Sequence, residues 1–125
     1  EADPGPNRRG SLDWSAMRYW ARARNRLPED PGVHACALLA MGDLRTGSPP
    51  RVAMTSQSPI QMTSLDYSMW FRGVAVADRW MLFDLHPGGN GGARGLTYGL
   101  VHAAQGQVAS FAMEMLLRQV GQPAA

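Results

Sequence analysis

An aspartate within a stretch of large apolar residues is the first residue of this sequence that could carry chemistry. Asp66 lies between Leu65 and Tyr67 in the segment Ser64 to Phe71. Burial among such neighbours would raise the pKa of its carboxyl group, whereas a nearby hydrogen-bond donor would lower it. The carboxylate could act as a general base or hold a water molecule for attack. The alternative is a strand aspartate that faces solvent or binds backbone, and the residue types leave both open.

Three further side chains could act as nucleophile or base. Cys36 would need a neighbouring base or a helix N-terminus to lower the pKa of its thiol, so we expect a small, buried, apolar residue instead. Ser68, His34 and Asp66 could be assembled into a Ser-His-Asp triad, but no nucleophile-elbow sequence surrounds Ser68. We therefore expect His34 to cap or hydrogen-bond backbone groups.

Arginines and glycines offer two candidate anion sites. Arg22, Arg24 and Arg26 alternate along one segment and could grip phosphates, although a solvated strand face explains them equally well. The run from Gly88 to Gly92 lacks the Lys-Ser/Thr continuation of a phosphate-binding loop. We expect that run to be a mobile hairpin connection.

Metal ligation is not indicated. His86 and His102 lie far apart in sequence and form no close-spaced pair with another histidine or cysteine. Cys36 is the only cysteine, which excludes an intrachain disulfide and a zinc site built from several thiolates. We expect no metal, no cofactor, surface positions for His86 and His102, and a reducing, cytoplasmic setting.

Composition indicates one globular domain. The chain has 125 residues, of which 45% are hydrophobic and 18% charged, enough to enclose a single core. Its 12 basic residues are all arginine and are interspersed with 10 acidic ones, so no concentrated basic face predicts nucleic-acid binding. No apolar run approaches the roughly 20 residues of a membrane span, and the first residues, Glu1 to Pro4, lack the charged and apolar blocks of a signal peptide. We expect a soluble protein with no membrane partner and, because the first residue is not methionine, a processed product or a fragment.

One helix and several strands must position these residues. Alternation from Met17 to Arg26 favours a strand with an arginine-rich face, although alanine and arginine suit a helix equally. Asp30-Pro31 is a good helix start, with aspartate as N-cap and proline at the first helical position. The segment that follows to Met41 is apolar all round, so we expect it to be buried on every side and to end within Gly42 to Pro50.

Four strands are predicted in the second half, over residues 64–71, 80–85, 94–102 and 108–118. Alternation in the first places four large apolar residues on one face: Leu65, Tyr67, Met69 and Phe71. The last has the corresponding face Ala109, Phe111, Met113, Met115 and Leu117. Asn90-Gly91 suits a tight hairpin turn, and Gln105-Gly106 joins the last two strands.

The order strand, helix and four strands predicts an α+β fold in which an antiparallel sheet wraps around one central helix. We expect the domain to occupy residues 14–119. Residues 1–13 are expected to be a disordered tail or linker remnant, and residues 120–125 a flexible C-terminus.

The segment from Ser64 to Arg72 resembles the acyl-CoA thioesterase II family, whose C-terminal hotdog repeat carries a similar Asp-His-Ser/Ala-Met-Trp-Phe-His segment. Weaker similarities follow the same order along the chain: Val33-His34, Trp80 to Phe83, Ala93 to Gly95, Val108 to Ser110 and Leu117-Arg118. The resemblance implies a hotdog fold. It also implies hydrolysis of fatty acyl-CoA to free acid and CoA by a water that an Asp, a Thr or Ser and a Gln orient.

By this resemblance Asp66 takes the place of the family aspartate. The hydroxyl-bearing loop of the family corresponds to Pro87 to Gly92, which contains no hydroxyl, and Met113 stands at the position of the glutamine. A thioether donates no hydrogen bond and accepts only weakly, so it cannot replace an amide in fixing a water. The substrate-binding positions expected from the resemblance are Gly88, Gly89, Met113 and Arg94.

Two main functions therefore stay open. The domain is either an acyl-CoA thioesterase that uses Asp66, or a catalytically degenerate hotdog repeat that binds acyl-CoA or only stabilises a partner. Nucleic-acid binding through the arginine row is a third, weaker interpretation. For the first two we expect acyl-CoA as ligand. We also expect a second hotdog repeat as partner, in a homo-oligomer or a longer chain, because a lone hotdog sheet leaves apolar surface uncovered.

Overall fold

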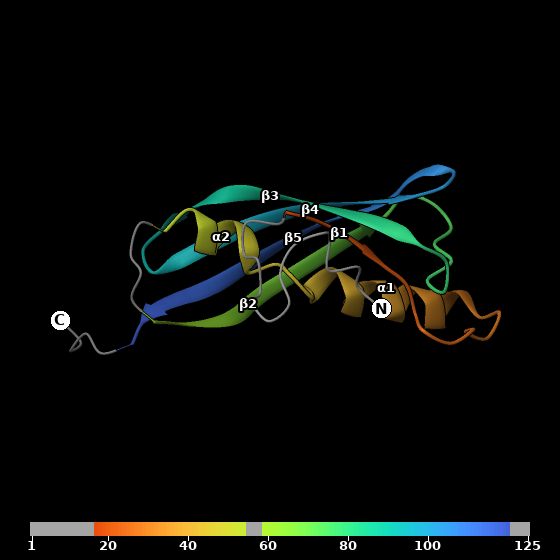
Figure 1. Ribbon diagram of the computed structural model, residues 1–125, viewed down its shortest axis with the longest axis horizontal. Helices are drawn as coiled ribbons and strands as arrows, with labels where there is room; N and C mark the ends of the chain where they lie inside the picture. Colours follow the sequence, from red (N-terminus) through yellow and green to blue (C-terminus); the bar gives the residue numbers. More distant parts are fainter. Residues whose placement is uncertain (1–16, 55–58, 121–125) are drawn as a thin grey trace, which may run out of the picture.

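The computed structural model of the protein describes residues 17–54 and 59–120. Its elements, in chain order, are β1 (Arg18–Ala21), α1 (Pro31–Asp43), α2 (Ser48–Val52), β2 (Ile60–Phe71), β3 (Met81–Gly91), β4 (Arg94–Ala103) and β5 (Gly106–Gln119). All strand pairs are antiparallel, and the sheet order is β1-β3-β4-β5-β2. Helix α1 lies along one face of this curved sheet, and α2 lies nearer the β3–β4 hairpin (Figure 1). The predicted α+β hotdog architecture is confirmed.

Helix α1 begins as the sequence predicts, but its burial differs. Asp30 Oδ1 accepts a hydrogen bond from the Gly32 N–H at 2.8 Å, and Pro31 occupies the first position. Within the helix only Leu38 and Gly42 are buried, whereas Cys36 is exposed. The helix is apolar on both sides, but only one side meets this sheet. The expectations of a fully buried helix and a buried Cys36 are therefore wrong.

Two tyrosines from opposite edges of the sheet hold α1 in place. Tyr19 Oη on β1 donates to the Met41 carbonyl at 2.7 Å, and Tyr67 Oη on β2 donates to the Leu39 carbonyl at 3.0 Å. Burial is the main cause that raises the pKa of both hydroxyls, so they remain protonated donors. A Cβ at Gly42 would collide with the Tyr67 hydroxyl, so glycine permits this close approach.

The first strand is shorter than predicted. Tyr19 and Ala21 are buried, in agreement with the predicted alternation. Pairing with β3 ends at Ala21, however, and the arginines that follow lie in the connection to α1. The prediction that they line one face of a strand is wrong.

The pairing of β2 with β5 contributes to the inner face, the face that α1 covers. Tyr67, Met69 and Phe71 lie opposite Met113, Phe111 and Ala109, as the predicted alternation requires. The register shifts between Ser64 and Asp66, which leaves Leu65 as a bulge residue that is 49% exposed. Leu65 therefore does not continue the apolar face to which the sequence assigned it.

The structure of the β3–β4 hairpin differs from the prediction in two ways. Strand β3 runs through the segment predicted to be a mobile loop and ends at Gly91. The turn falls on Gly92 and Ala93, whose φ values are 59° and 60°, in place of Asn90-Gly91. Asn90 instead donates through Nδ2 to the Pro50 carbonyl at 2.8 Å, which ties the hairpin to α2.

Buried side chains form two clusters on the inner face. The larger lies under α1 and includes Leu38, Phe83 and Phe111, and the smaller is built on Met113, Met115 and Leu117. Among the described residues, no helix is long and apolar enough to cross a membrane. The predicted N-terminal tail and all but the first residue of the predicted C-terminus lie outside the described residues.

Candidate functional site

Asp66 lies at the bulge of β2, which is an edge strand of the sheet. Its side chain is exposed, so the environment of large apolar neighbours considered from the sequence does not bury it. Directly across the pair with β5 stands Glu114. A carboxylate in this place is open to water and to a ligand that approaches the β2 edge.

Arg94 extends this pair into a charged cluster. Its Nη1 lies 3.8 Å from Glu114 Oε1, and both side chains are partly exposed. The cluster of Asp66, Glu114 and Arg94 thus holds two acids and one base. Asp66 and Arg94 were predicted from the sequence as site residues, whereas Glu114 was not. The position of Glu114 next to Met113 could have indicated it, because adjacent residues of a strand point to opposite faces of the sheet.

Met113 lies on the buried side of β5 and is 1% exposed. Its cross-strand neighbours are Tyr67 on β2 and Thr97 on β4. Ser64 donates from Oγ to the Met113 sulfur at 3.4 Å. The position expected to hold a polar, water-fixing group is therefore part of the core, with the Ser64 hydroxyl beside it.

The two glycines expected to bind substrate lie at a second bulge, on β3. Gly89 pairs with Leu96, Leu96 pairs with Glu114, and Glu114 pairs with Asp66, so Gly89 and Asp66 share one row across the sheet. Three strand spacings of about 4.8 Å separate them by roughly 14 Å along the sheet. Within one chain the row aligns these positions without bringing them into contact. At Gly88, a Cβ would overlap Leu96 and Tyr98, so packing requires glycine there.

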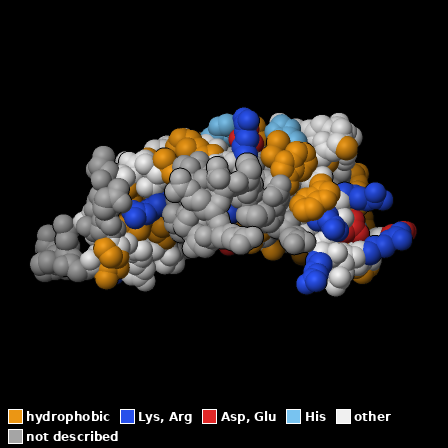
Figure 2. Space-filling view, in the orientation of Figure 1, with side chains coloured by type: hydrophobic (Ala, Val, Ile, Leu, Met, Phe, Trp, Pro, Cys, Tyr) orange, Lys and Arg blue, Asp and Glu red, His pale blue; other side chains and the backbone are white. Residues whose placement is uncertain are grey.

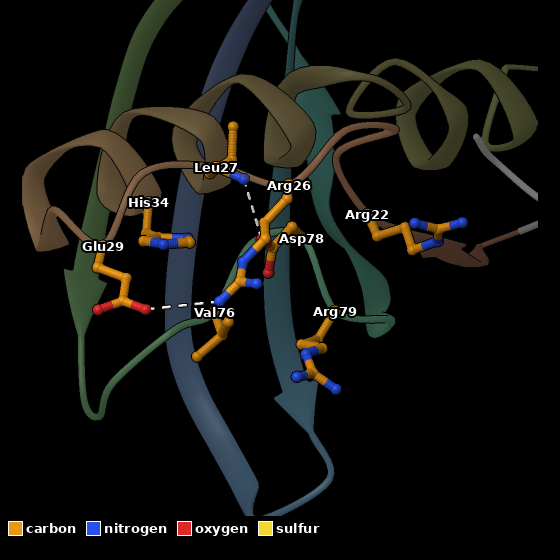
Figure 3. A pocket seen from close by; sticks show the side chains of 8 residues that line it. All are labelled: Arg22, Arg26, Leu27, Glu29, His34, Val76, Asp78 and Arg79. Atoms are coloured by element: carbon orange, nitrogen blue, oxygen red, sulfur yellow. Dashed lines mark hydrogen bonds and ion pairs between the residues drawn. The ribbon is translucent and has the colours of Figure 1, made fainter.

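Ser68, His34 and Asp66 do not come together as a catalytic triad. Ser68 pairs with Ala112 on the face of β2 opposite to Tyr67, whereas His34 lies on α1. His34 Nδ1 accepts a hydrogen bond from the Ala77 N–H at 3.0 Å, which confirms the expected backbone partner. His34 also lines a cavity with residues of the β1–α1 and β2–β3 connections (Figure 3).

The predicted arginine row is dispersed. Arg22 lies over the Trp80 ring at 5.1 Å, and Arg26 forms an ion pair with Glu29 at 3.5 Å. Arg24 is exposed. Arginine side chains gather at the end of the molecule where the β1–α1 connection lies (Figure 2).

The other histidines do not form a metal site. His86 Nε2 lies 3.5 Å from Asp84 Oδ2, and that side chain is half exposed, in agreement with the predicted surface position. His102 is only partly exposed. Among residues 17–54 and 59–120, no group of three or more His, Cys, Asp or Glu side chains is placed to hold a metal ion.

Two acyl-coenzyme A thioesterases are similar to this chain in sequence. Acyl-coenzyme A thioesterase 8 of Rattus norvegicus is 32% identical over 108 residues, which make up 85% of this chain and 33% of the relative. The Homo sapiens protein of the same name is 33% identical over 93 residues, or 73% of this chain and 29% of the relative. This chain therefore spans about a third of these relatives.

Two solved structures are also similar to this chain. The acyl-CoA thioesterase II TesB2 from Mycobacterium marinum has a TM-score of 0.75 at 36% identity, covering 89% of this chain and 45% of that chain. The tesB protein from Mycobacterium avium subs paratuberculosis has a TM-score of 0.73 at 23% identity, covering 86% of this chain and 44% of that chain, and it supports the fold alone. The family described as "Acyl-CoA thioesterase C-terminal domain" matches residues 1–117. On these matches and the hotdog architecture, the chain belongs to the family of acyl-CoA thioesterase C-terminal domains.

Proposed function

We propose that this domain takes part in the hydrolysis of fatty acyl-CoA, with Asp66 orienting the attacking water. The observation that carries the proposal is the exposed Asp66 carboxylate at the β2 bulge, within the segment that resembles the family motif. Water donates a hydrogen bond to the carboxylate and attacks the thioester carbonyl. The proton passes to Asp66, the C–S bond breaks, and the CoA thiolate takes up a proton. The products are one free acid and one CoA thiol.

Arg94, Gly88 and Gly89 are proposed to bind the substrate. Arg94 is the one base of the cluster with Asp66 and Glu114, and its exposed guanidinium can pair with an anionic group of CoA in place of Glu114. The β3 bulge at Gly88 interrupts the regular ladder and can leave a backbone N–H available for a ligand. Met113 is not included in this proposal, because its side chain is buried in the core of this domain.

A second hotdog repeat is proposed to complete the site. The outward side of α1 exposes Val33, Cys36 and Ala40, and among the residues that the structure describes β2 has a strand partner on one side only. Unpaired edges and apolar faces of this kind favour association. We propose a homo-oligomer, or a longer chain that carries both repeats, in the cytoplasm and in fatty acid metabolism. The single cysteine supports a reducing compartment.

A catalytically degenerate repeat is the second candidate. It is favoured by the buried Met113 at the position of the family glutamine and by the lack of any hydroxyl from Pro87 to Gly92. Such a repeat would bind acyl-CoA, or stabilise its partner, without turnover.

Release of free thiol from a panel of acyl-CoA thioesters distinguishes the two candidates. We expect turnover that Asp66→Asn abolishes and that Asp43→Asn, which removes an exposed carboxylate from α1, leaves unchanged. Binding of acyl-CoA without release of thiol would reject the enzyme and support the degenerate repeat. Neither binding nor turnover would reject both the enzyme and a repeat that binds acyl-CoA, and would leave a repeat that only stabilises its partner.

A further inference from the structure

Two cavities lie beside the first turn of α1 and share three lining residues, and together they are here named the His34 groove. A cavity of about 490 Å³ has apolar walls, and one of about 550 Å³ has arginine-bearing walls. Glu29, His34 and Val76 line both. The apolar compartment is completed by Pro31, Ala35, Phe71, Gly73, Val74 and Ala75. The arginine compartment is completed by Arg22, Arg26, Leu27, Asp78 and Arg79. Each volume suits a small ligand.

The arginine compartment carries more positive than negative charge. Its three arginines face two carboxylates, Asp78 and Glu29. Asp78 Oδ2 accepts a hydrogen bond from the Leu27 N–H at 3.0 Å, and this bond is the main cause that lowers its pKa. Asp78 is therefore ionised, and its carboxylate already accepts a backbone hydrogen bond. The compartment favours an anionic ligand group.

The ion pair at the mouth of the groove is exchangeable. Arg26 and Glu29 are 3.5 Å apart, and their side chains are 84% and 91% exposed. An exposed pair of this kind contributes little to stability. In Figure 3 the Arg26 side chain extends across the groove toward Glu29, near His34 and Val76. A ligand carboxylate that arrives there can replace Glu29 as the partner of Arg26.

His34, which lines both compartments, supplies a second donor. Because its Nδ1 accepts the Ala77 N–H, that nitrogen carries no proton. The proton of the neutral ring is therefore on Nε2, which is a hydrogen-bond donor. Arg26 and His34 can thus bind an anion at the boundary of an apolar compartment.

We propose that the His34 groove binds a fatty carboxylate. The alkyl chain occupies the apolar compartment, and the carboxylate accepts hydrogen bonds from Arg26 and His34 Nε2. This site is distinct from the proposed hydrolytic centre. Phe71, on the groove wall, lies five residues along β2 from Asp66, a distance of about 17 Å.

Isothermal titration of the full chain with dodecanoate and hexadecanoate tests the proposal. We expect Arg26→Gln to weaken binding about ten-fold or more, since charge-assisted hydrogen bonds are lost. Glu29→Gln should strengthen binding several-fold because a competing carboxylate is removed. Arg24→Gln is the matched control, since Arg24 lies in the same connection and lines neither compartment. Equal losses in Arg24→Gln and Arg26→Gln, or no gain in Glu29→Gln, would overturn the proposal.

Two further sets of measurements vary the alkyl length of the ligand and replace the ligand with CoA. Affinity should rise with alkyl length by up to about four-fold per buried methylene. Val74→Ser should reduce that rise without unfolding the protein, because Val74 is 77% exposed. CoA without an acyl chain should bind the groove more weakly than hexadecanoate, and equal or tighter binding would identify a phosphate site instead. Asp66→Asn should bind hexadecanoate normally, so loss of hydrolysis and loss of this site are distinguishable.

Discussion

Asp66 and Glu114 stand directly opposite each other across the β2–β5 pair, so two carboxylates share one cross-strand position. Like charges placed this way repel, typically by about 0.2–1 kcal/mol. Arg94 lies near Glu114 and offsets part of this repulsion. One of the two carboxylates belongs to the residue proposed to orient water.

A double-mutant cycle measures this relationship. Glu114→Gln should increase the free energy of unfolding by a few tenths of a kcal/mol more in the native sequence than in Asp66→Asn. Urea unfolding of the four proteins at pH 7 gives the coupling, and added salt should reduce it. A coupling of zero at low salt would show that the two carboxylates point apart.

The anchoring of α1 gives a second prediction. Tyr19→Phe should lower the free energy of unfolding by about 1–2 kcal/mol, because it leaves the Met41 carbonyl without this partner in a buried setting. Tyr67→Phe should cost less, about 0.5 kcal/mol, because Tyr67 is only half buried and water can replace its hydroxyl. Equilibrium unfolding in urea ranks the two, and a larger loss for Tyr67→Phe would contradict the assigned roles.

Gly42 should not tolerate alanine although it lies in a helix. Alanine ordinarily gains about 1 kcal/mol over glycine in a helix interior. Here the added Cβ would overlap the Tyr67 hydroxyl and lies 3.1 Å from Met69 Cε. We expect a net loss of about 1–2 kcal/mol, measured by thermal or urea unfolding. In the Tyr67→Phe background the loss should be smaller, and an unchanged loss would exclude the hydroxyl as its cause.

Ala93 should gain stability as glycine. It is the only non-glycine residue with positive φ among residues 17–54 and 59–120, and the left-handed region is unfavourable for residues with a Cβ. Ala93→Gly should increase the free energy of unfolding by roughly 0.5–1 kcal/mol. Ala104→Gly, in the β4–β5 turn, is the control and should be neutral or destabilising. A destabilised Ala93→Gly would reject the turn geometry.

Local sequence rules predicted the features that depend on near neighbours. Asp30 caps α1 as expected, because the accepting oxygen and the Gly32 N–H are two residues apart. The alternation in β5 also holds, since one of its faces is buried from Ala109 to Leu117. Such features require no knowledge of what packs from elsewhere in the chain.

Features set by strand register were not predictable in this way. The bulge at Leu65, the turn at Gly92-Ala93 and the opposition of Asp66 to Glu114 all depend on which residue pairs with which across strands. Alternation in Arg22 to Arg26 favours a strand, but β1 pairs with β3 only as far as Ala21. The apolar outward side of α1 similarly could not be predicted to be exposed, because its exposure depends on which other elements pack against the helix.

Acidification should weaken the attachment of β1 through Asp84. Arg18 Nε donates to Asp84 Oδ1 at 2.9 Å, and this bond is the main cause that holds the pKa of Asp84 below its ordinary value of 3.8. A carboxyl group with a lowered folded-state pKa stabilises the fold above its unfolded pKa, and that contribution is lost as the pH falls through the folded pKa. Asp84→Asn should therefore be less stable than the native protein at pH 7, and the gap should close below about pH 4. Urea midpoints from pH 7 to pH 3 measure the gap, and Arg18→Gln should follow the same trend because it removes the other partner. A gap that does not change with pH would mean that the ion pair contributes nothing to the stability of the β1 edge.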